Sequence, residues 1–345
     1  MQAAIIGFSK AGKSTLFSVV TGRDVTAFRK EGEAIEAVAV VRDPRVDDIA
    51  GIVRPKRIRY AEMRVVLVPD VRHGSDSAEW VDPARRSDLL CVVVRGFNAD
   101  DVYHEKGSVD PERDRRDMTA ELLLADLELI EKRLDRIGRE KKSGETPAQM
   151  MEEKTLVKCK GAVEAGRLLN DLDLTPQEQQ AVRQLDLLSR VPVLWVYNVD
   201  EGRIAEAQTQ WPSAFVVSGK IEREIMAIED PQEREQYLRD IGLEMSGSDR
   251  LIRAAYDKLG MMSFYTMGPD EARAWTIRKN TAAPAAGGKI HSDIERGFIR
   301  VEVIKHADLM AAGSEAAARA QGKMQLRGRD YIIEDGDICL FRFNV

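Results

Sequence analysis

Cysteine is scarce in this chain, and no hydrophobic run approaches the length of a membrane helix. The three cysteines, Cys91, Cys159 and Cys339, are odd in number and far apart, which excludes a disulfide framework and matches no zinc-site spacing. No apolar stretch is long enough to span a bilayer. The start, MQAAIIGFSK, also lacks the charged and cleavable apolar regions of a secretory signal. We therefore expect a cytoplasmic protein without membrane contact.

Blocks of like charge are also absent. Charged residues make up 32% of the sequence, the formal net charge is −6, and hydrophobic residues make up 43%. The whole molecule therefore lacks the charge of a typical nucleic-acid binder, although a local basic face remains open. A length of 345 residues with this apolar content indicates two or three compact domains.

Short Val- and Leu-rich runs alternate with helical or loop segments. Such a pattern predicts a mostly parallel α/β sheet with helices on both faces. We expect strands at 3–6, 64–68, 89–94, 191–197 and 214–217, and a helix at 14–20.

A helix-rich stretch interrupts this alternation. Apolar residues follow a 4-3-4-3 spacing that is typical of a coiled-coil seam, and a similar seam follows the polar turn KKSGETP. The first seam comprises Leu123, Leu127, Ile130, Leu134 and Ile137, and the second comprises Leu156, Cys159, Val163 and Gly166. We interpret this as an inserted antiparallel helical hairpin. Two ordinary surface helices remain the alternative.

The residue pattern of the sequence changes again from about Ser263. Alternating segments at 298–303, 330–333 and 338–343, with turn residues between them, predict a small β-rich domain. The expected domains are 1–112 with 190–262 for the α/β domain, 113–189 for the hairpin, and 263–345 for the β-rich domain.

The sharpest motif is GFSKAGKS, which fits the phosphate-binding loop pattern G-x(4)-G-K-[ST]. Its glycines let backbone N–H groups form an anion nest, and the following helix adds the positive end of its dipole. Lys13 would reach the β- and γ-phosphates, and the Ser14 hydroxyl would take one Mg²⁺ position. The predicted phosphate-binding residues are Ser9, Lys10, Ala11, Gly12, Lys13, Ser14 and Thr15.

A second motif, Asn198-Val199-Asp200-Glu201, follows the strand predicted at 191–197. Guanine-specific P-loop proteins have N-K-x-D here, and its Asp accepts hydrogen bonds from guanine. In this chain Val199 replaces the Lys and Glu201 replaces the Asp, which favours ATP over GTP. The predicted base-binding residues are Asn198, Val199, Glu201, Ser218, Gly219 and Lys220.

Several segments together resemble the Obg-like ATPases, the YchF group, along nearly the whole chain. The resemblance rests on GFSKAGKSTLF, DPRVDDIAGIVRPKR, ELLLADLELIEKRL, NVDE, and the C-terminal blocks RAWTIRKNTAAPAAGGKIHSDIERGFIRVEVI and GRDYIIEDGDICLFRFNV. It implies a P-loop NTPase domain with an inserted hairpin and a C-terminal β-grasp (TGS) domain. It also implies ATP with Mg²⁺ as ligand, and the ribosome or RNA as partner through the hairpin tip and the TGS domain.

The chain departs from this family in three places. Lys10 stands where the family's P-loop has Asn, and the stretch 28–45 offers no Thr for Mg²⁺, with Ala34 nearest by alignment. After Val68 the family's Asp and Gly spacing is altered, and the glycine-rich segment is mostly absent. Asp70 is therefore a metal candidate, beside Ser14, only if this loop is rebuilt. We expect slow or vestigial hydrolysis.

Two further features have alternative interpretations. His104 matches a loop histidine that the family is thought to use near the γ-phosphate, but a solvated loop histidine is the alternative. The basic residues at the predicted hairpin tip either contact RNA phosphates or form a solvated helix face. They are Lys132, Arg133, Arg136, Arg139, Lys141 and Lys142. A slow ATPase that docks to the ribosome, a nucleotide-binding module without hydrolysis, and a GTPase are the functions considered.

Overall fold

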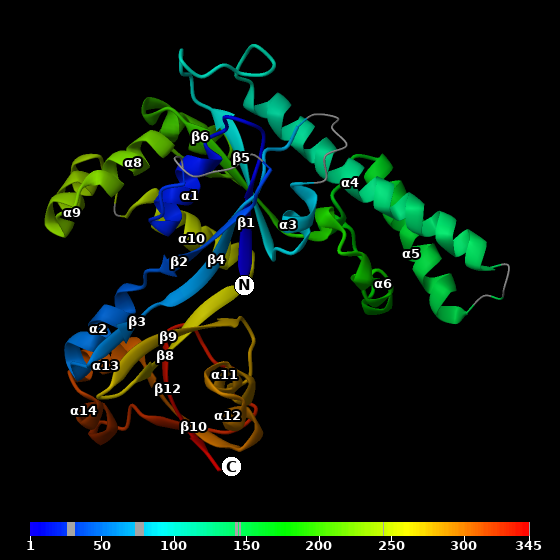
Figure 1. Ribbon diagram of the computed structural model, residues 1–345. Coiled ribbons are helices and arrows are strands. Elements are labelled where there is room, and N and C mark those ends of the chain that lie inside the picture. Colours follow the sequence, from blue (N-terminus) through cyan, green and yellow to red (C-terminus); the bar gives the residue numbers. More distant parts are fainter. Residues whose placement is uncertain (26–31, 73–78, 142–143, 145, 244, 345) are drawn as a thin grey trace. The chain divides into compact units, whose positions relative to one another are not determined.

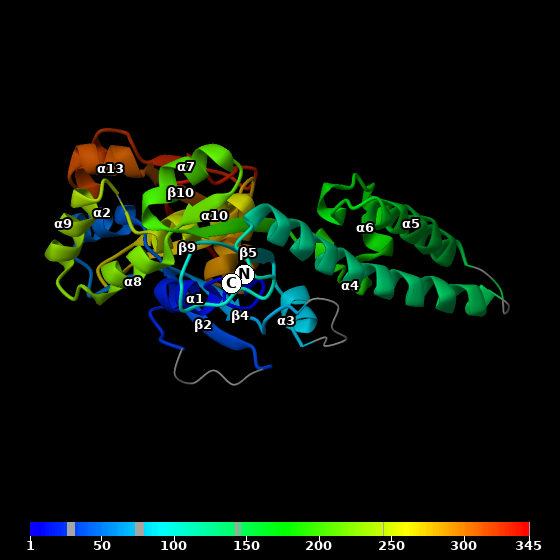
Figure 2. The same cartoon turned by 90° about the horizontal axis from the view of Figure 1, so that it is seen from above.

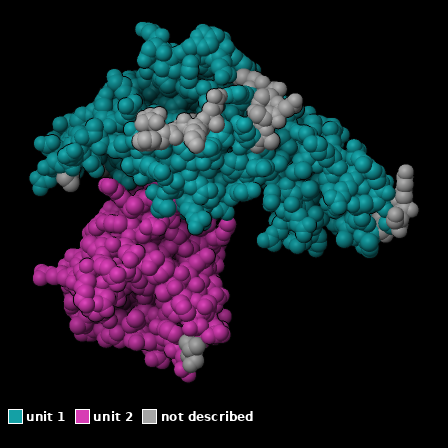
Figure 3. Space-filling view, in the orientation of Figure 1, with its two compact units in different colours: residues 1–38, 64–251 teal, residues 39–63, 252–345 magenta. Residues whose placement is uncertain are grey.

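The computed structural model describes residues 1–25, 32–72, 79–141, 144, 146–243 and 245–344. These residues form two compact units, 1–38 with 64–251 and 39–63 with 252–345 (Figure 3). Residues 39–63 were expected in the nucleotide-binding domain, but they pack within the C-terminal unit. The first unit also includes the predicted hairpin, so the three-domain division stays a prediction.

A six-stranded sheet of order β2-β4-β1-β5-β6-β7 forms the centre of the first unit (Figure 1). β1 pairs in parallel with β4 and β5, and β6 pairs in parallel with β5 and β7. Parallel neighbours on both sides explain why the central strands β1, β5 and β6 are nearly continuous buried runs. The strands are β1 (Gln2–Ile6), β2 (Ile35–Val41), β4 (Ala61–Leu67), β5 (Leu89–Gly96), β6 (Val193–Val199) and β7 (Phe215–Val217).

The helices of this unit follow the predicted alternation with the strands. They are α1 (Lys13–Thr21), α3 (Val81–Arg85), α6 (Pro176–Ala181), α7 (Ile204–Gln210), α8 (Gly219–Ala227) and α9 (Pro231–Asp240), and α10 (Gly247–Lys258) begins in this unit and ends in the second. Short 3-10 turns are η2 (Leu169–Asp171), η3 (Arg183–Leu185), η4 (Leu188–Arg190) and η5 (Glu201–Arg203). The mostly parallel α/β fold is therefore confirmed.

The hairpin consists of α4 (Pro111–Glu140) and α5 (Pro147–Glu164), which lie side by side (Figures 1 and 2). Asp110 caps α4 with Pro111 at its first position, and Thr146 forms a capping box with Gln149 at the start of α5. The predicted seam residues Leu123, Ile130, Ile137, Leu156, Cys159 and Val163 are buried in one apolar cluster. Gly166 was wrongly included in the seam, because it lies beyond the end of α5 and is exposed.

The second unit contains a sheet of order β11-β10-β12-β8-β9-β3. Its strands are β3 (Arg57–Arg59), β8 (Met261–Met267), β9 (Glu271–Arg278), β10 (Phe298–Lys305), β11 (Gln325–Arg327) and β12 (Asp337–Phe343). Its helices are α2 (Pro44–Val53), α11 (Ala283–Ile290), α12 (Ser292–Arg296), α13 (His306–Ala312) and α14 (Glu315–Ala320). The strand predicted at 330–333 was wrong, because only a single bridge from Ile332 to Ala282 forms there.

A polar network around the buried side chains of Asp43 and Tyr265 explains why residues 39–63 belong to the second unit. Asp43, the N-cap of α2, accepts hydrogen bonds from Arg45 and from the Tyr265 hydroxyl on β8. Arg45 also pairs with Asp335 at 2.7 Å. This network ties α2 to β8 and to the turn before β12, which lie more than two hundred residues away in the sequence.

Candidate nucleotide-binding site

The loop between β1 and α1 has the backbone that the phosphate-binding motif requires. Gly12, the N-cap of α1, has φ 96°, a left-handed conformation that favours glycine. A Cβ atom at Gly12 would lie 2.1 Å from Nδ2 of Asn198, and one at Gly7 would lie 2.4 Å from the Val93 carbonyl oxygen. Both glycines are therefore needed for close packing beneath the loop.

Lys13, the predicted phosphate-binding lysine, is the first residue of α1. It is 3% exposed, it donates to the Phe8 carbonyl oxygen, and its Nζ is 3.0 Å from Asp70 Oδ1. Val71 forms a parallel bridge with Phe8, which keeps the chain after β4 beside the loop. The structure thus brings Asp70 to the phosphate loop despite the altered spacing in the sequence.

Asn198 at the end of β6 connects the phosphate loop to the segment after β7. Its Nδ2 donates to the Ala11 carbonyl oxygen at 3.1 Å, and its Oδ1 accepts from the Gly219 N–H at 2.9 Å. A Cβ atom at Gly219 would lie 3.4 Å from Cγ2 of Thr15 on α1. Three segments distant in sequence therefore meet here.

The remaining predicted base residues differ in their surroundings. Ser218 is 3% exposed and precedes α8, whereas Lys220 and Glu201 are exposed. Val199 does not join them, because it is 1% exposed in an apolar cluster with Tyr197. Alternate strand residues face opposite sides of the sheet. Val199 therefore points away from the side that Asn198 faces.

His104 lies in the loop after β5 and close to the phosphate loop. Its Nε2 is 2.9 Å from Asp114 Oδ2, and its Nδ1 accepts from the Lys106 backbone N–H at 3.2 Å. This pattern places the ring proton on Nε2. His104 and Asp114 line a cavity of about 10 Å³ together with Ser9 and Ala11, which is about the space of one water molecule.

Two arginines that the sequence interpretation missed hold this histidine loop. Arg95 at the end of β5 donates to the carbonyl oxygens of Phe97 and Val102, and burial lowers the pKa of its guanidinium. Arg113 donates to Asp114 Oδ1 at 2.9 Å and to the Ser108 carbonyl oxygen at 2.7 Å. The sequence signal that could have identified Arg95 is a single arginine at the end of an otherwise apolar strand.

Lys10 and Ala34 are the two remaining positions at which the sequence departs from the family. Lys10 has φ 60°, is exposed, and places its Nζ 5.8 Å from the centre of the Tyr103 ring. Ala34 is exposed and immediately precedes β2. Residues 28–31 of the stretch without Thr, and residues 73–74 of the altered segment after Val68, lie outside the described residues.

Comparisons with known proteins match this chain over its full length. A family model described as YchF-GTPase_C, a protein of unknown function (DUF933), matches residues 261–344. "Ribosome-binding ATPase YchF" of Bacillus subtilis is 35% identical over 100% of both chains, and "Ribosome-binding ATPase YchF" of Escherichia coli O157:H7 is 34% identical over 100% of this chain and 99% of its own.

A chicken relative and a solved structure extend the same likeness. "Obg-like ATPase 1" of Gallus gallus is 32% identical over 100% of this chain and 92% of its own. The solved Schizosaccharomyces pombe YchF GTPase superposes with a TM-score of 0.82 at 26% identity, covering 99% of this chain and 97% of that one. With identity above 30% over complete chains and the phosphate loop folded as described, this chain belongs to the YchF family of Obg-like ATPases.

Proposed function

We propose that this chain binds ATP with Mg²⁺ in the phosphate loop and hydrolyses it slowly, in connection with binding to the ribosome or to RNA. The observation that supports this most directly is the meeting of Lys13, Asp70 and Asn198 around one loop. Lys13 and the N-terminus of α1 would bind the phosphates, which they attract by charge and by backbone N–H groups. Binding to ribosomes would take place in the cytoplasm.

The oxygen atoms near Lys13 fit a magnesium ion. Mg²⁺ is usually held by one or two protein oxygens together with substrate phosphates. Ser14 on the first turn of α1 and Asp70 would supply such oxygens. In the described part of the chain no group of three or more His, Cys, Asp or Glu residues forms a metal cage. When bound, the ion would neutralise charge on the β- and γ-phosphates.

The base preference rests on Glu201. The printed names of the relatives do not decide it, because some are called ATPase and one is called GTPase. A glutamate is one methylene longer than the aspartate that reads guanine, so ATP should bind at least as tightly as GTP. Competition between labelled ATP and GTP tests this, and GTP displacing ATP with a large advantage would overturn it.

The variant Glu201→Asp sharpens this test. Losing or gaining a bidentate contact changes binding by a few kcal/mol, which corresponds to about tenfold or more in affinity. Glu201→Asp should therefore shift the ATP-to-GTP ratio toward GTP. Val199→Lys is not a suitable companion, because Val199 is 1% exposed and a lysine there would bury its charge.

Slow hydrolysis follows from how His104 is held. Both ring nitrogens already have partners, Asp114 and the Lys106 N–H, so one hydrogen bond must be exchanged before the ring can position a water. We expect His104→Ala to abolish turnover while ATP affinity stays unchanged, with Lys13→Ala as the control that also loses binding. A robust turnover in His104→Ala would remove His104 from the mechanism.

A nucleotide-binding module without hydrolysis is the second candidate function. The engaged ring of His104 favours it, and so does the absence of Thr between residues 28 and 45. Tight ATP binding with no phosphate release above that of Lys13→Ala would support it.

The hairpin tip was predicted as an RNA contact, and its ion pairs now bear on that prediction. Arg133 pairs with Glu152 at 2.6 Å, and Arg136 pairs with Glu140 at 2.8 Å. Lys132 and Lys141 also have acidic partners, Glu128 and Glu153, and Lys142 lies outside the described residues. Much of the basic charge is thus compensated locally.

Ribosome binding through the tip is tested by one combined variant. It neutralises Arg136, Arg139, Lys141 and Lys142. We expect weaker co-sedimentation with ribosomes, a steep dependence on salt, and unchanged ATP binding. Co-sedimentation equal to that of the parent would show that the tip is only a solvated face.

A further inference from the structure

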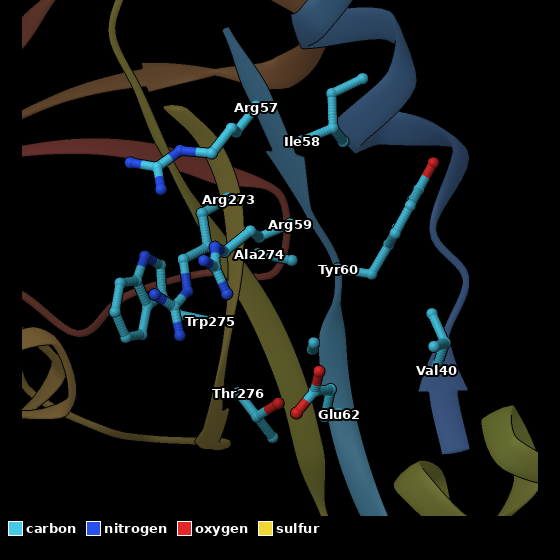
Figure 4. Close-up of a pocket in the computed structure, with 11 residues that line it drawn as sticks. Val40, Arg57, Ile58, Arg59, Tyr60, Glu62, Arg273, Ala274, Trp275 and Thr276 are labelled. Atoms are coloured by element: carbon cyan, nitrogen blue, oxygen red, sulfur yellow. The ribbon is translucent and has the colours of Figure 1, made fainter. Parts of the chain in front are cut away.

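A basic hollow of about 600 Å³ opens along β3 and β9 in the second unit (Figure 4). We call it the arginine hollow and define it by Arg57, Arg59, Arg273 and Trp275. Figure 4 shows these four side chains on one side of the two strands, whereas Ile58 and Tyr60 lie on the other.

The register of the strands explains why these side chains share a face. β3 pairs in parallel with β9, with Arg57 beside Glu271 and Arg59 beside Arg273. Side chains two residues apart point to the same side, so Arg57 and Arg59 join Glu271, Arg273 and Trp275. All three residues of β3 are exposed.

The charges in the arginine hollow are not balanced. Glu271 forms ion pairs with two arginines, with Arg59 at 2.9 Å and with Arg273 at 3.7 Å. Arg57 forms no ion pair with any residue that the structure describes. Glu62 also lines the hollow, so three guanidinium groups face two carboxylates. Neighbouring like charges repel, and an anionic ligand between them would relieve that repulsion.

The guanidinium group of Arg273 stacks on the indole ring of Trp275 within the arginine hollow. The Arg273 guanidinium is 3.9 Å from the centre of the Trp275 ring, and Trp275 Nε1 donates to Thr266 Oγ1 at 2.9 Å. The hydrogen bond fixes the indole plane. Unpaired RNA bases stack on aromatic rings and on guanidinium planes, while arginines bind the phosphates between them.

Protection of a sheet edge is the competing explanation. β3 is an edge strand, and charged side chains there discourage pairing with other chains. That explains charge on β3 itself, but it does not explain a guanidinium fixed on a tryptophan of the inner strand β9.

We propose that the arginine hollow binds a short stretch of single-stranded RNA, with Arg57 and Arg59 on the phosphates and the Arg273–Trp275 pair against a base. The proposal rests on the proposed function for its partner class, but it concerns a surface separate from the nucleotide site and from the hairpin tip. It also assigns the RNA contact to arginines that have fewer acidic partners than the tip residues.

The test uses the full-length chain and a fluorescent ten-nucleotide oligouridine. Anisotropy titrations over a range of salt concentrations compare the parent with Arg57→Gln/Arg59→Gln. Each phosphate contact to a single strand contributes about 0.7 to the slope of log affinity against log salt. The double variant should therefore bind more weakly, with a slope shallower by about 1.4.

The matched control is Arg278→Gln/Arg300→Gln, which removes the same charge from exposed positions of the same unit. It should keep the slope of the parent. Equal thermal melting and equal ATP binding would show that both variants are folded. Trp275→Leu should weaken oligouridine binding without changing the salt slope, because it removes stacking and no phosphate contact.

The outcomes separate this inference from the proposed function. A double variant with the slope and affinity of the parent overturns the inference. So does loss of ribosome binding with unchanged oligouridine binding, because the hollow would then contact ribosomal protein. A parent that binds ribosomes but no oligouridine also overturns it, whereas a parent that binds neither overturns the RNA partner as well.

Discussion

Removing the Asn198 side chain should weaken both the fold and ATP binding. Asn198 is 5% exposed, and its amide satisfies the Ala11 carbonyl oxygen and the Gly219 N–H. Asn198→Ala leaves both backbone groups without their partner. These groups belong to the phosphate loop and to the start of α8, so the change loosens both sides of the nucleotide site.

The size of the effect follows from those two hydrogen bonds. A buried polar group that loses its partner destabilises a protein by about 1–3 kcal/mol. Two such groups give about 2–6 kcal/mol, and water entering the vacated space reduces this to about 2–4 kcal/mol. We expect the free energy of unfolding to fall by this amount. ATP affinity should fall by at least about tenfold, which corresponds to 1.4 kcal/mol, because the loops are no longer held in the binding conformation.

The assay pairs urea unfolding with a titration of labelled ATP under native conditions. Asn170→Ala is the matched control, since Asn170 is exposed in the short turn η2. It should leave both the free energy of unfolding and the ATP affinity unchanged.

One result would refute the reasoning. If Asn198→Ala bound ATP as tightly as the parent, the bridge would not position the nucleotide loops. Its hydrogen bonds would then matter for folding alone.

Three further predictions concern other parts of the molecule. Burial by itself would raise the pKa of Asp43, but hydrogen bonds from Arg45 and Tyr265 outweigh it and lower that pKa. The ionised Asp43 therefore stabilises the fold fully at pH values above its unfolded pKa near 4, and this stabilisation is lost as pH falls through its lower folded pKa. The free energies of unfolding of the parent and of Asp43→Asn should therefore converge as pH is lowered from 6 to 3. Lys10 stands where the family's P-loop has the Asn through which related proteins hold a monovalent cation near the phosphates, so its ammonium group should take the place of that cation. Turnover should therefore be equal in potassium and sodium buffers, and Lys10→Asn should introduce a potassium dependence; a parent that needs potassium would contradict this. Ile130 is 0% exposed in the hairpin core, so Ile130→Ala should reduce the free energy of unfolding by about 2–5 kcal/mol in urea titrations with unchanged ATP affinity, and a smaller loss would mean that the hairpin repacks.

Local patterns in the sequence were sufficient for several features. The glycines and Lys13 specify the phosphate loop because backbone conformation and charge at neighbouring positions define that motif. The seam through Ile130 predicts the hairpin because the helical repeat places such residues on one face. The helical repeat also predicted Gly166 as a seam residue, which was wrong. Gly166 follows the end of α5 and is exposed.

Other features depended on tertiary structure, because they join residues far apart in the chain. Nothing near Asp114 marks it as the partner of His104, and burial of Val199 follows from which face of β6 meets the core. The pairing of Arg59 with Arg273 arises only because β3 docks on β9, with a separation of over two hundred residues. A sequence lists the charges, whereas the register of the sheet decides which of them share a surface.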